Sequence, residues 1–277
     1  MDLGDYYSKS FEGFKKNPNI AAPALVLNVL TYVLSFVVAI IIFFMLAGND
    51  FLTTGQISQN MTSLPSTSTI LLVGPLFIVL VIVLALISCF VYASTIGMSK
   101  RVILGDRPGL NTAMEYGKKY FLKILAVSII IGILMVLMFI PLGLGLALDY
   151  MYNLGFILTA IGGLITIIGL IAIGLLLIFA YQSIVVGEKS IIGSLKESFQ
   201  LFKKRPFEII IVLIINAIIL IIIGLVVGVL NLFLGIIPIL GMILSFIISI
   251  AVNTLTFPYF TMVLTYLYMD VKEVLPE

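Results

Sequence analysis

The sequence predicts an all-α polytopic membrane protein with six spanning helices. Of its 277 residues, 62% are hydrophobic and only 10% are charged, whereas a soluble domain is about half apolar and one quarter charged. A water-soluble fold of this length could not bury so much apolar surface. Six apolar runs are long enough to cross the hydrocarbon, which takes about 20 residues. The Lys and Arg residues lie at the two ends of the chain and in alternate connections between these runs, apart from Lys123 in the first turn of the third run.

The six spans are bounded by polar, Gly or Pro segments. We expect them at residues 20–47, 70–98, 121–148, 156–186, 207–234 and 239–268. The first is too long to be a cleaved signal and should remain as a helix. The fourth is longer than a straight crossing needs, so it should tilt or begin with a loosened turn at Gly162-Gly163. The glycines of the third and fourth spans favour close helix approach or motion.

The basic residues predict the orientation. Fourteen of the 15 Lys and Arg residues lie before the first span, between the second and third, between the fourth and fifth, or after the sixth, and Lys123 lies in the first turn of the third. Short loops rich in Lys and Arg stay in the cytoplasm, so both termini should be cytoplasmic, in the cell membrane. The connection after the first span contains Asn60-Met61-Thr62, which is either a glycosylation acceptor or an ordinary polar loop.

Two short motifs recur and predict three parallel repeats. The first and third repeats contain a head segment, Phe-x-x-Phe-Lys-Lys-x-Pro, at residues 11–18 and 199–206. A degenerate head of the second repeat lies at residues 116–121. Each repeat closes on a tail segment, Phe-x-Tyr-x-Ser/Thr, at residues 90–94, 179–183 and 257–261. The repeats cover residues 1–99, 100–188 and 189–277. Because each contains two spans, all share one orientation about an axis along the membrane normal.

The heads should form amphipathic helices at the membrane interface that turn into the spans at Pro or, in the degenerate head, at the aromatic pair Tyr120-Phe121. Apolar residues recur at helical spacing on one face, at Leu3, Tyr7, Phe11 and Phe14 and again at Ile192, Leu195, Phe199 and Phe202. Capping-box patterns at 112–115 and 194–197 predict where the second and third heads begin. The candidate lipid-headgroup contacts are Lys15, Lys16, Lys118, Lys119, Lys203, Lys204 and Arg205. The alternative is that these charges only set the topology.

Uncharged polar residues are the candidate lining of a cavity on the repeat axis. No Asp, Glu, Lys or Arg lies in the middle of a span, which argues against a proton-coupled pump and an intramembrane aspartyl or metalloprotease. Asn28 and Asn216 lie equally far past the head prolines, and they either bond across helices or line the cavity. The tails offer Tyr92, Tyr181, Tyr259, Ser94, Ser183 and Thr261. These would ring a cytoplasmic mouth, or serve as an aromatic belt with helix-end hydrogen bonds.

Other chemistry is excluded by composition. Histidine is absent, which removes the commonest metal ligand and general acid–base. No phosphate loop or dinucleotide fingerprint is present, and Cys89 is a lone thiol in an apolar run. We therefore expect no catalytic residue, no cofactor, no metal and, because basic residues are few, no nucleic-acid partner. Membrane lipids are the expected partners.

The heads, tails and six spans together resemble a poorly characterised group of prokaryotic, largely archaeal, integral membrane proteins. That group is similar to the membrane domain fused to some glycerophosphoryl diester phosphodiesterases. The resemblance carries over no catalytic residue, because this chain lacks the soluble phosphodiesterase domain. We expect a non-enzymatic membrane protein that binds or passes a lipid-like or small neutral solute. The alternatives are a structural or anchoring module for a partner protein and, less favoured, an intramembrane enzyme.

Overall fold

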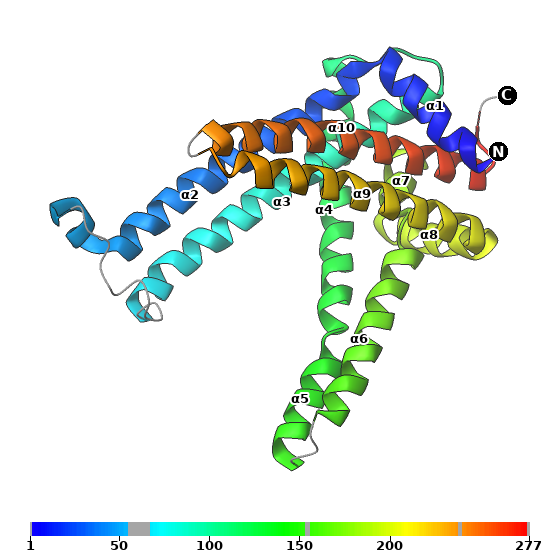
Figure 1. Ribbon diagram of the computed structural model, residues 1–277. Helices are drawn as coiled ribbons and strands as arrows, with labels where there is room; N and C mark the ends of the chain where they lie inside the picture. Colours follow the sequence, from blue (N-terminus) through cyan, green and yellow to red (C-terminus); the bar gives the residue numbers. More distant parts are fainter. Residues whose placement is uncertain (1, 55–66, 153–155, 238–239, 276–277) are drawn as a thin grey trace. The chain divides into compact units, whose positions relative to one another are not determined.

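The structure is a computed structural model that describes residues 2–54, 67–152, 156–237 and 240–275. Its described residues are almost entirely helical (Figure 1). Six helical segments are long and apolar enough to cross a membrane: Pro18–Ile41, Gly74–Ile103, Leu110–Tyr152, Ile157–Val185, Pro206–Leu234 and Leu240–Val271. The predicted all-α polytopic membrane fold is therefore confirmed. The glycosylation pattern at Asn60 lies outside the described residues.

The chain divides into two compact units, residues 1–24 with 89–277 and residues 25–88. The helices are α1 (Leu3–Lys16), α2 (Ala22–Thr54), α3 (Thr67–Ile103), α4 (Leu110–Leu137), α5 (Ile140–Tyr152), α6 (Ile157–Leu176), α7 (Ala180–Val185), α8 (Ile191–Lys204), α9 (Pro206–Leu234) and α10 (Leu240–Val271), with a 3-10 helix at Pro18–Ala21. The second unit holds α2 from Leu25 onwards and α3 up to Ser88, and every Lys and Arg belongs to the first.

The first and third heads are separate helices that end just before the predicted prolines. After α1 and α8, Asn17 and Arg205 leave the helical conformation, and Pro18 and Pro206 begin the next helices. Proline lacks an N–H, so it interrupts a helix interior but suits a first turn. The predicted capping box at 194–197 was wrong. Helix α8 begins at Ile191, because the Ser190 hydroxyl accepts the N–H of Gly193 and caps the helix earlier.

The middle head is not a separate helix, contrary to the prediction. Helix α4 continues without interruption from Leu110 to Leu137 and includes the aromatic pair Tyr120-Phe121. No proline stands there, so the backbone hydrogen bonds continue into the span. Helix α4 begins directly after its N-cap, Gly109, and so starts before the predicted capping pattern at 112–115.

The third and fourth spans are each interrupted, but not at the predicted glycine pair. Helix α4 ends just before α5, which carries Pro141 in its first turn, and α6 continues through Gly162-Gly163. The fourth span breaks instead at residues 177–179. Here the Ser198 hydroxyl of α8 donates to Leu176 O at 2.9 Å and accepts the Phe179 N–H at 3.0 Å. A side chain inserted into the hydrogen-bond ladder is a recognised cause of such a break.

Helices α5 and α6 form an antiparallel hairpin in which the backbones touch. An added Cβ at Gly145 would collide with Leu158 O, and one at Gly162 would collide with Pro141 O. At the hairpin end, the Asp149 carboxylate accepts the N–H of Leu158 at 3.1 Å and of Thr159 at 2.7 Å. It thereby supplies the cap for the first turn of α6.

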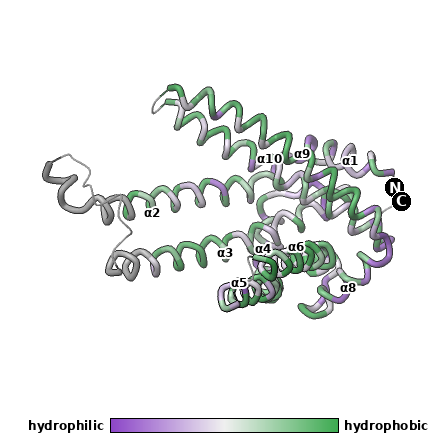
Figure 2. The backbone as a smooth tube through the Cα atoms, turned by 60° about the horizontal axis from the view of Figure 1, so that its bottom comes forward, coloured by the Kyte–Doolittle hydropathy of each residue, from purple (hydrophilic) through white to green (hydrophobic). Residues whose placement is uncertain are grey.

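The buried core of the first unit lies where heads meet tails. Three clusters of buried side chains are centred on Tyr268, Tyr120 and Met262. The first tail packs on α4, the second on α8 and the third on α1, so the head-to-tail contacts close a ring. The hydrophilic residues gather at α1, α8 and the chain termini, whereas α6, α9 and α10 are mostly hydrophobic along their length (Figure 2).

Candidate functional site

The three tails reach one cavity of about 250 Å³ in the first unit. Its polar lining comes from Tyr92 on α3, Tyr181 and Gln182 on α7, and Thr261 on α10. The other walls are Ile and Leu side chains of α3, α4, α6, α10 and the α6–α7 break, together with Gly174. No charged side chain is among these lining residues. A concave, largely apolar site with a few convergent polar groups is typical of small-molecule binding.

Gln182 is the most informative of these residues. It is only 4% exposed, and its Oε1 has no hydrogen-bond partner among the described residues. An unsatisfied buried acceptor destabilises a fold by about 1–3 kcal/mol, and native structures satisfy such groups with protein, water or ligand. The amide occurs in the second tail alone, because the equivalent residues are Ala93 and Phe260. The amide that lines the cavity therefore comes from the second tail.

The aromatic walls are held in place by residues from all three tails. The Tyr181 hydroxyl lies 3.0 Å from Ser128 Oγ on α4. The Tyr92 ring lies 5.5 Å from the Tyr181 ring and packs edge-on against Phe257 at 4.8 Å. Such aromatic pairs contribute about 0.5–1.5 kcal/mol beyond their buried area. The cavity wall is thus preorganised.

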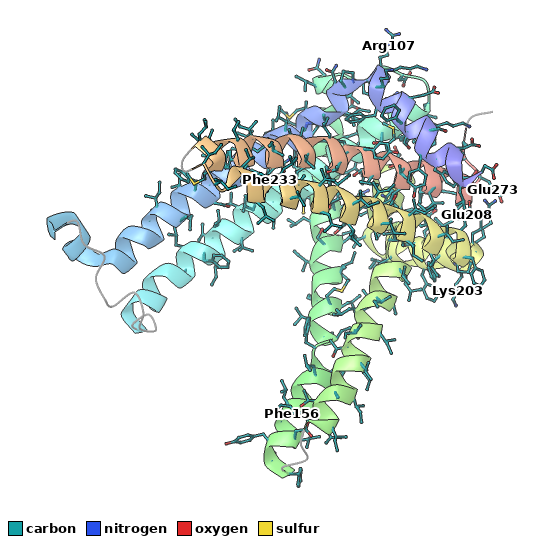
Figure 3. All side chains as sticks on the ribbon, viewed as in Figure 1. Arg107, Phe156, Lys203, Glu208, Phe233 and Glu273 are labelled. Atoms are coloured by element: carbon teal, nitrogen blue, oxygen red, sulfur yellow. The ribbon has the colours of Figure 1, made fainter. Side chains whose placement is uncertain are left out.

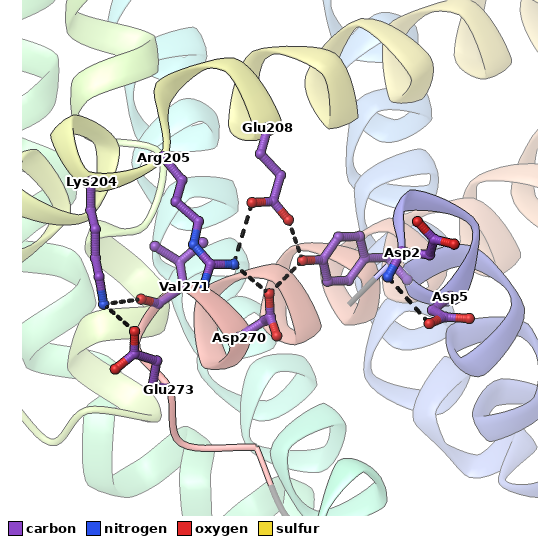
Figure 4. A network of polar contacts seen from close by, with 9 residues as sticks. Asp2, Asp5, Lys204, Arg205, Glu208, Asp270, Val271 and Glu273 are labelled. Atoms are coloured by element: carbon purple, nitrogen blue, oxygen red, sulfur yellow. Dashed lines mark hydrogen bonds and ion pairs between the residues drawn. The ribbon is translucent and has the colours of Figure 1, made fainter.

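A charged cluster joins α1, α9 and α10 (Figure 4). The Tyr6 hydroxyl lies 2.5 Å from the Glu208 carboxylate and 2.7 Å from that of Asp270. Arg205 lies 3.0 Å from Asp270 and 3.4 Å from Glu208. Burial, and then the hydrogen bonds to both carboxylates, hold the pKa of Tyr6 far above its usual range. Tyr6 therefore stays protonated as a donor.

A second charged cluster is centred on Glu197 of α8. Its carboxylate accepts from the Ser183 hydroxyl, from Lys272 Nζ at 2.9 Å and from the Tyr268 hydroxyl at 3.1 Å. Burial alone would raise the pKa of Glu197, but the hydrogen bonds from Ser183 and Lys272 outweigh it and lower the pKa. Because Ser183 follows Gln182 directly, this cluster holds the turn of α7 that carries the cavity amide.

The charged residues are arranged as ion pairs rather than as a metal site. Among the described residues, no group of three or more Asp, Glu or Cys side chains is placed to hold a metal ion.

The sequence matches the family described as a domain of unknown function (DUF7847) over residues 1–271. The chain belongs to this family. No curated protein and no solved structure matches it.

In this DUF7847 protein the predicted tail residues have two different roles. Tyr92, Tyr181 and Thr261 line the cavity. The other three make contacts between segments: Ser183 donates to Glu197, and the Ser94 Oγ lies 2.7 Å from Ala113 O on α4. The Tyr259 hydroxyl donates to Tyr7 O at 3.3 Å. These hydroxyls hold tails against heads and do not ring a mouth.

The two predicted asparagines lie in different units. Asn216 on α9 is buried, and its Oδ1 accepts from the Tyr7 hydroxyl at 2.9 Å, which fastens α1 to α9. Burial, followed by the nearby Tyr259, raises the pKa of Tyr7 to about 12. Asn28 lies half-buried on α2 in the unit of residues 25–88.

The predicted headgroup cations fall into two groups, those that pair with other segments of the protein and those that do not. Lys119 pairs with Glu188 at 3.4 Å, Lys204 with Glu273 at 2.8 Å, and Arg205 belongs to the Tyr6 cluster. Lys16 pairs with Glu12 at 3.5 Å, with both side chains exposed, and Lys203 lies over the Phe199 ring. Lys15 and Lys118 are exposed. Three of the seven thus join segments of the protein and are less available to lipid.

Sequence reasoning did not identify Glu197 or Ser198 as important to the site. Ser198 does carry a signal: it stands immediately before the Phe that opens the third head, as Ser10 does in the first. Both serines are fully buried. At Ser198 this burial accompanies hydrogen bonds to Phe179, in the second tail, and to Leu176.

Proposed function

We propose that this protein binds a small uncharged solute, or the uncharged polar part of a lipid-like molecule, in the cavity between the tails. The observation that carries the proposal is the buried Oε1 of Gln182, which has no hydrogen-bond partner among the described residues, on a wall that is otherwise mostly apolar. A ligand hydroxyl or amide would donate to Gln182, while Ile and Leu side chains would cover the ligand's apolar part. A charged ligand is disfavoured, because no lining residue could neutralise it.

The cavity size limits the ligand. About 250 Å³ lies near the lower end of ligand pockets, which are about 300–1,000 Å³. A short polyol, alcohol or amide would fit, whereas only part of a lipid would enter. With Tyr and Thr hydroxyls and one amide as the polar lining, the cavity offers little for acid–base chemistry at neutral pH. The proposed role is therefore binding without catalysis.

We propose that the heads lie on the cytoplasmic surface of the cell membrane, with the cavity opening towards that side. Support comes from the contact between Tyr6 and Asp270, near opposite ends of the chain, as an even number of spans requires. All 15 Lys and Arg residues also belong to the first unit, which holds both termini.

Filling the cavity tests the proposal. A Cβ added at Gly174 meets no atom within 4 Å, so the leucine side chain of Gly174→Leu should fill the cavity without a backbone clash. Gly224→Leu is the matched control, because Gly224 on α9 is equally open and does not line the cavity. Native mass spectrometry of the protein purified in a mild neutral detergent should find a small adduct on the wild type and on Gly224→Leu. The adduct should be lost from Gly174→Leu and from Gln182→Leu. An adduct that persists in Gly174→Leu, or none on any variant, overturns the proposal.

Passage across the membrane is tested separately with glycerol as the uncharged probe. Proteoliposomes containing the wild type should swell faster in glycerol than protein-free vesicles, and Gly174→Leu should abolish the difference. If the adduct is present but swelling is unchanged, the function is binding alone.

A second candidate, a membrane anchor or scaffold for a partner protein, is supported by the resemblance to a membrane domain fused to glycerophosphoryl diester phosphodiesterases. On this hypothesis a soluble enzyme should co-purify with the wild type and equally with Gly174→Leu. If the enzyme co-purifies with the wild type but not with Gly174→Leu, the first candidate is favoured.

A further inference from the structure

We infer a second ligand site, specific for a phosphate group, between α1 and the connection that joins α3 to α4. A cavity of about 360 Å³ lies there. Lys9 and Lys16 of α1, Asp106 and Arg107 of the connection, and Tyr266 of α10 contribute to its lining. It shares no lining residue with the cavity between the tails. The inference therefore goes beyond the proposed function and stands independently of it.

The charges of this site do not cancel. Its lining contains three cations and two carboxylates. Each carboxylate already has a cation: Glu12 pairs with Lys16 at 3.5 Å, and Asp106 pairs with Arg101 at 3.1 Å.

Lys9 on α1 and Arg107 on the connection make no ion pair within the described part of the chain. They approach from two different segments, and concave walls concentrate the field of such charges. The site therefore favours an anion. Figure 3 shows the Arg107 side chain reaching out from the connection.

The residue types favour phosphate among anions. The Arg guanidinium is a planar fork that binds two oxygens of one phosphate, and Lys supplies a compact charge to another oxygen. The phenol of Tyr266 also lines the site and can donate a hydrogen bond. The remaining volume accommodates a small organic group on the phosphate. Both a lipid headgroup and a soluble phosphoester carry this chemistry.

The backbone around the site is preorganised. At Gly13 an added Cβ would lie 3.0 Å from Val102 Cγ1 and 3.3 Å from Met262 Sδ, so glycine lets α1 lie close to α3 and α10. Gly105 has a φ of +89°, which favours glycine, and its N–H donates to Val102 O at 3.0 Å. The turn, together with the Arg101–Asp106 ion pair, sets the position from which Arg107 extends.

Binding by the full chain, delipidated in a neutral detergent, tests the inference. The probes are glycerol 3-phosphate in solution and phosphatidylglycerol in nanodiscs made with an equal amount of phosphatidylcholine. Arg107→Gln and Lys9→Gln should each weaken binding about tenfold, because each removes a charge-assisted hydrogen bond. Lys196→Gln is the control, since Lys196 is exposed on α8, outside the cavity and outside the predicted headgroup contacts. It should change affinity by less than about twofold.

The two probes distinguish the sources of phosphate. Binding of glycerol 3-phosphate assigns the site to a soluble phosphoester, whereas retention of phosphatidylglycerol alone assigns it to a lipid headgroup. Either result supports the inference when Arg107 and Lys9 are required. The inference is overturned if neither probe binds, or if Lys196→Gln weakens binding as much as Arg107→Gln. Unchanged thermal unfolding of the variants checks their folding, and Arg107→Lys should retain part of the affinity. Because this site is separate, loss of the small adduct in Gly174→Leu should leave phosphate binding intact.

Discussion

The hydroxyl of Tyr6 lies 2.7 Å from the carboxylate of Asp270, which joins the first helix of the chain to the last. The same hydroxyl lies 2.5 Å from Glu208, and Arg205 lies 3.0 Å from Asp270. One hydroxyl donates to one acceptor at a time, so Arg205 supplies the further donors that two carboxylates need. The cluster therefore fastens α1 to both α9 and α10.

Removing this hydroxyl should destabilise the protein. We expect Tyr6→Phe to lower the free energy of unfolding by about 1–3 kcal/mol, because the part-buried carboxylates of Glu208 and Asp270 would lose a hydrogen-bond donor. Denaturant unfolding in detergent micelles measures the change. Tyr150→Phe, at a residue that is 88% exposed, should change stability by less than about 0.5 kcal/mol. Equal effects of the two substitutions would show that the Tyr6 contact contributes nothing.

Glu197 should make stability depend on pH in the acidic range. Because the folded state lowers its pKa, the charged carboxylate stabilises the fold above the usual value of 4.5 and loses this effect as the pH falls through the lowered pKa. The difference in unfolding free energy between the wild type and Glu197→Gln should be largest at neutral pH and shrink on acidification below 4.5. Glu115→Gln, at an exposed position of α4, is the control and should change little. A difference independent of pH would contradict the assignment.

Asp149 should control the start of α6. Asp149→Ala should lower stability by about 1–2 kcal/mol, because the N–H groups of Leu158 and Thr159 lose their acceptor. Hydrogen exchange of these two amides should accelerate, whereas Asp106→Ala, in the connection between α3 and α4, should leave α6 unchanged. Slow exchange in Asp149→Ala would mean that another group caps the helix.

The glycines of the α5–α6 hairpin should not be equivalent. Gly162→Ala places a methyl group against Pro141 O and should destabilise the hairpin by about 1–3 kcal/mol. Gly143→Ala, where an added Cβ meets open space, should be neutral or stabilise the helix by up to about 1 kcal/mol. Thermal unfolding of both variants measures the contrast. Equal behaviour would argue against backbone contact in this hairpin.

The sequence was most informative where the signal for a feature is local. Pro206 marks the start of α9, and the predicted span 207–234 agrees with Pro206–Leu234. The break at residues 177–179 could not be predicted locally, because the Ser198 hydroxyl that compensates it is 22 residues from Leu176. The middle head was expected to turn at Tyr120-Phe121 as the others turn at Pro, yet aromatic residues leave the backbone ladder intact.

The candidate site was predictable only in part, for the same reason. Recurrence of the tail motif singled out Tyr92, Tyr181 and Thr261, which line one cavity. It could not separate these from Ser94 and Ser183, because the partners of those hydroxyls, Ala113 O and Glu197, belong to the following heads. That Gln182 Oε1 has no partner among the described residues depends on its tertiary surroundings, which one sequence does not display.

Site-directed labelling tests most directly the claim that all heads lie on one membrane surface. In a Cys89→Ala background, Lys15→Cys, Lys118→Cys and Lys203→Cys should all react with a membrane-impermeant maleimide from the same side of sealed vesicles. Tyr150→Cys, at the end of the α5–α6 hairpin, should react only from the other side. Labelling of Lys118→Cys and Lys203→Cys from opposite sides would contradict the shared orientation of the three repeats, and with it the cavity their tails enclose.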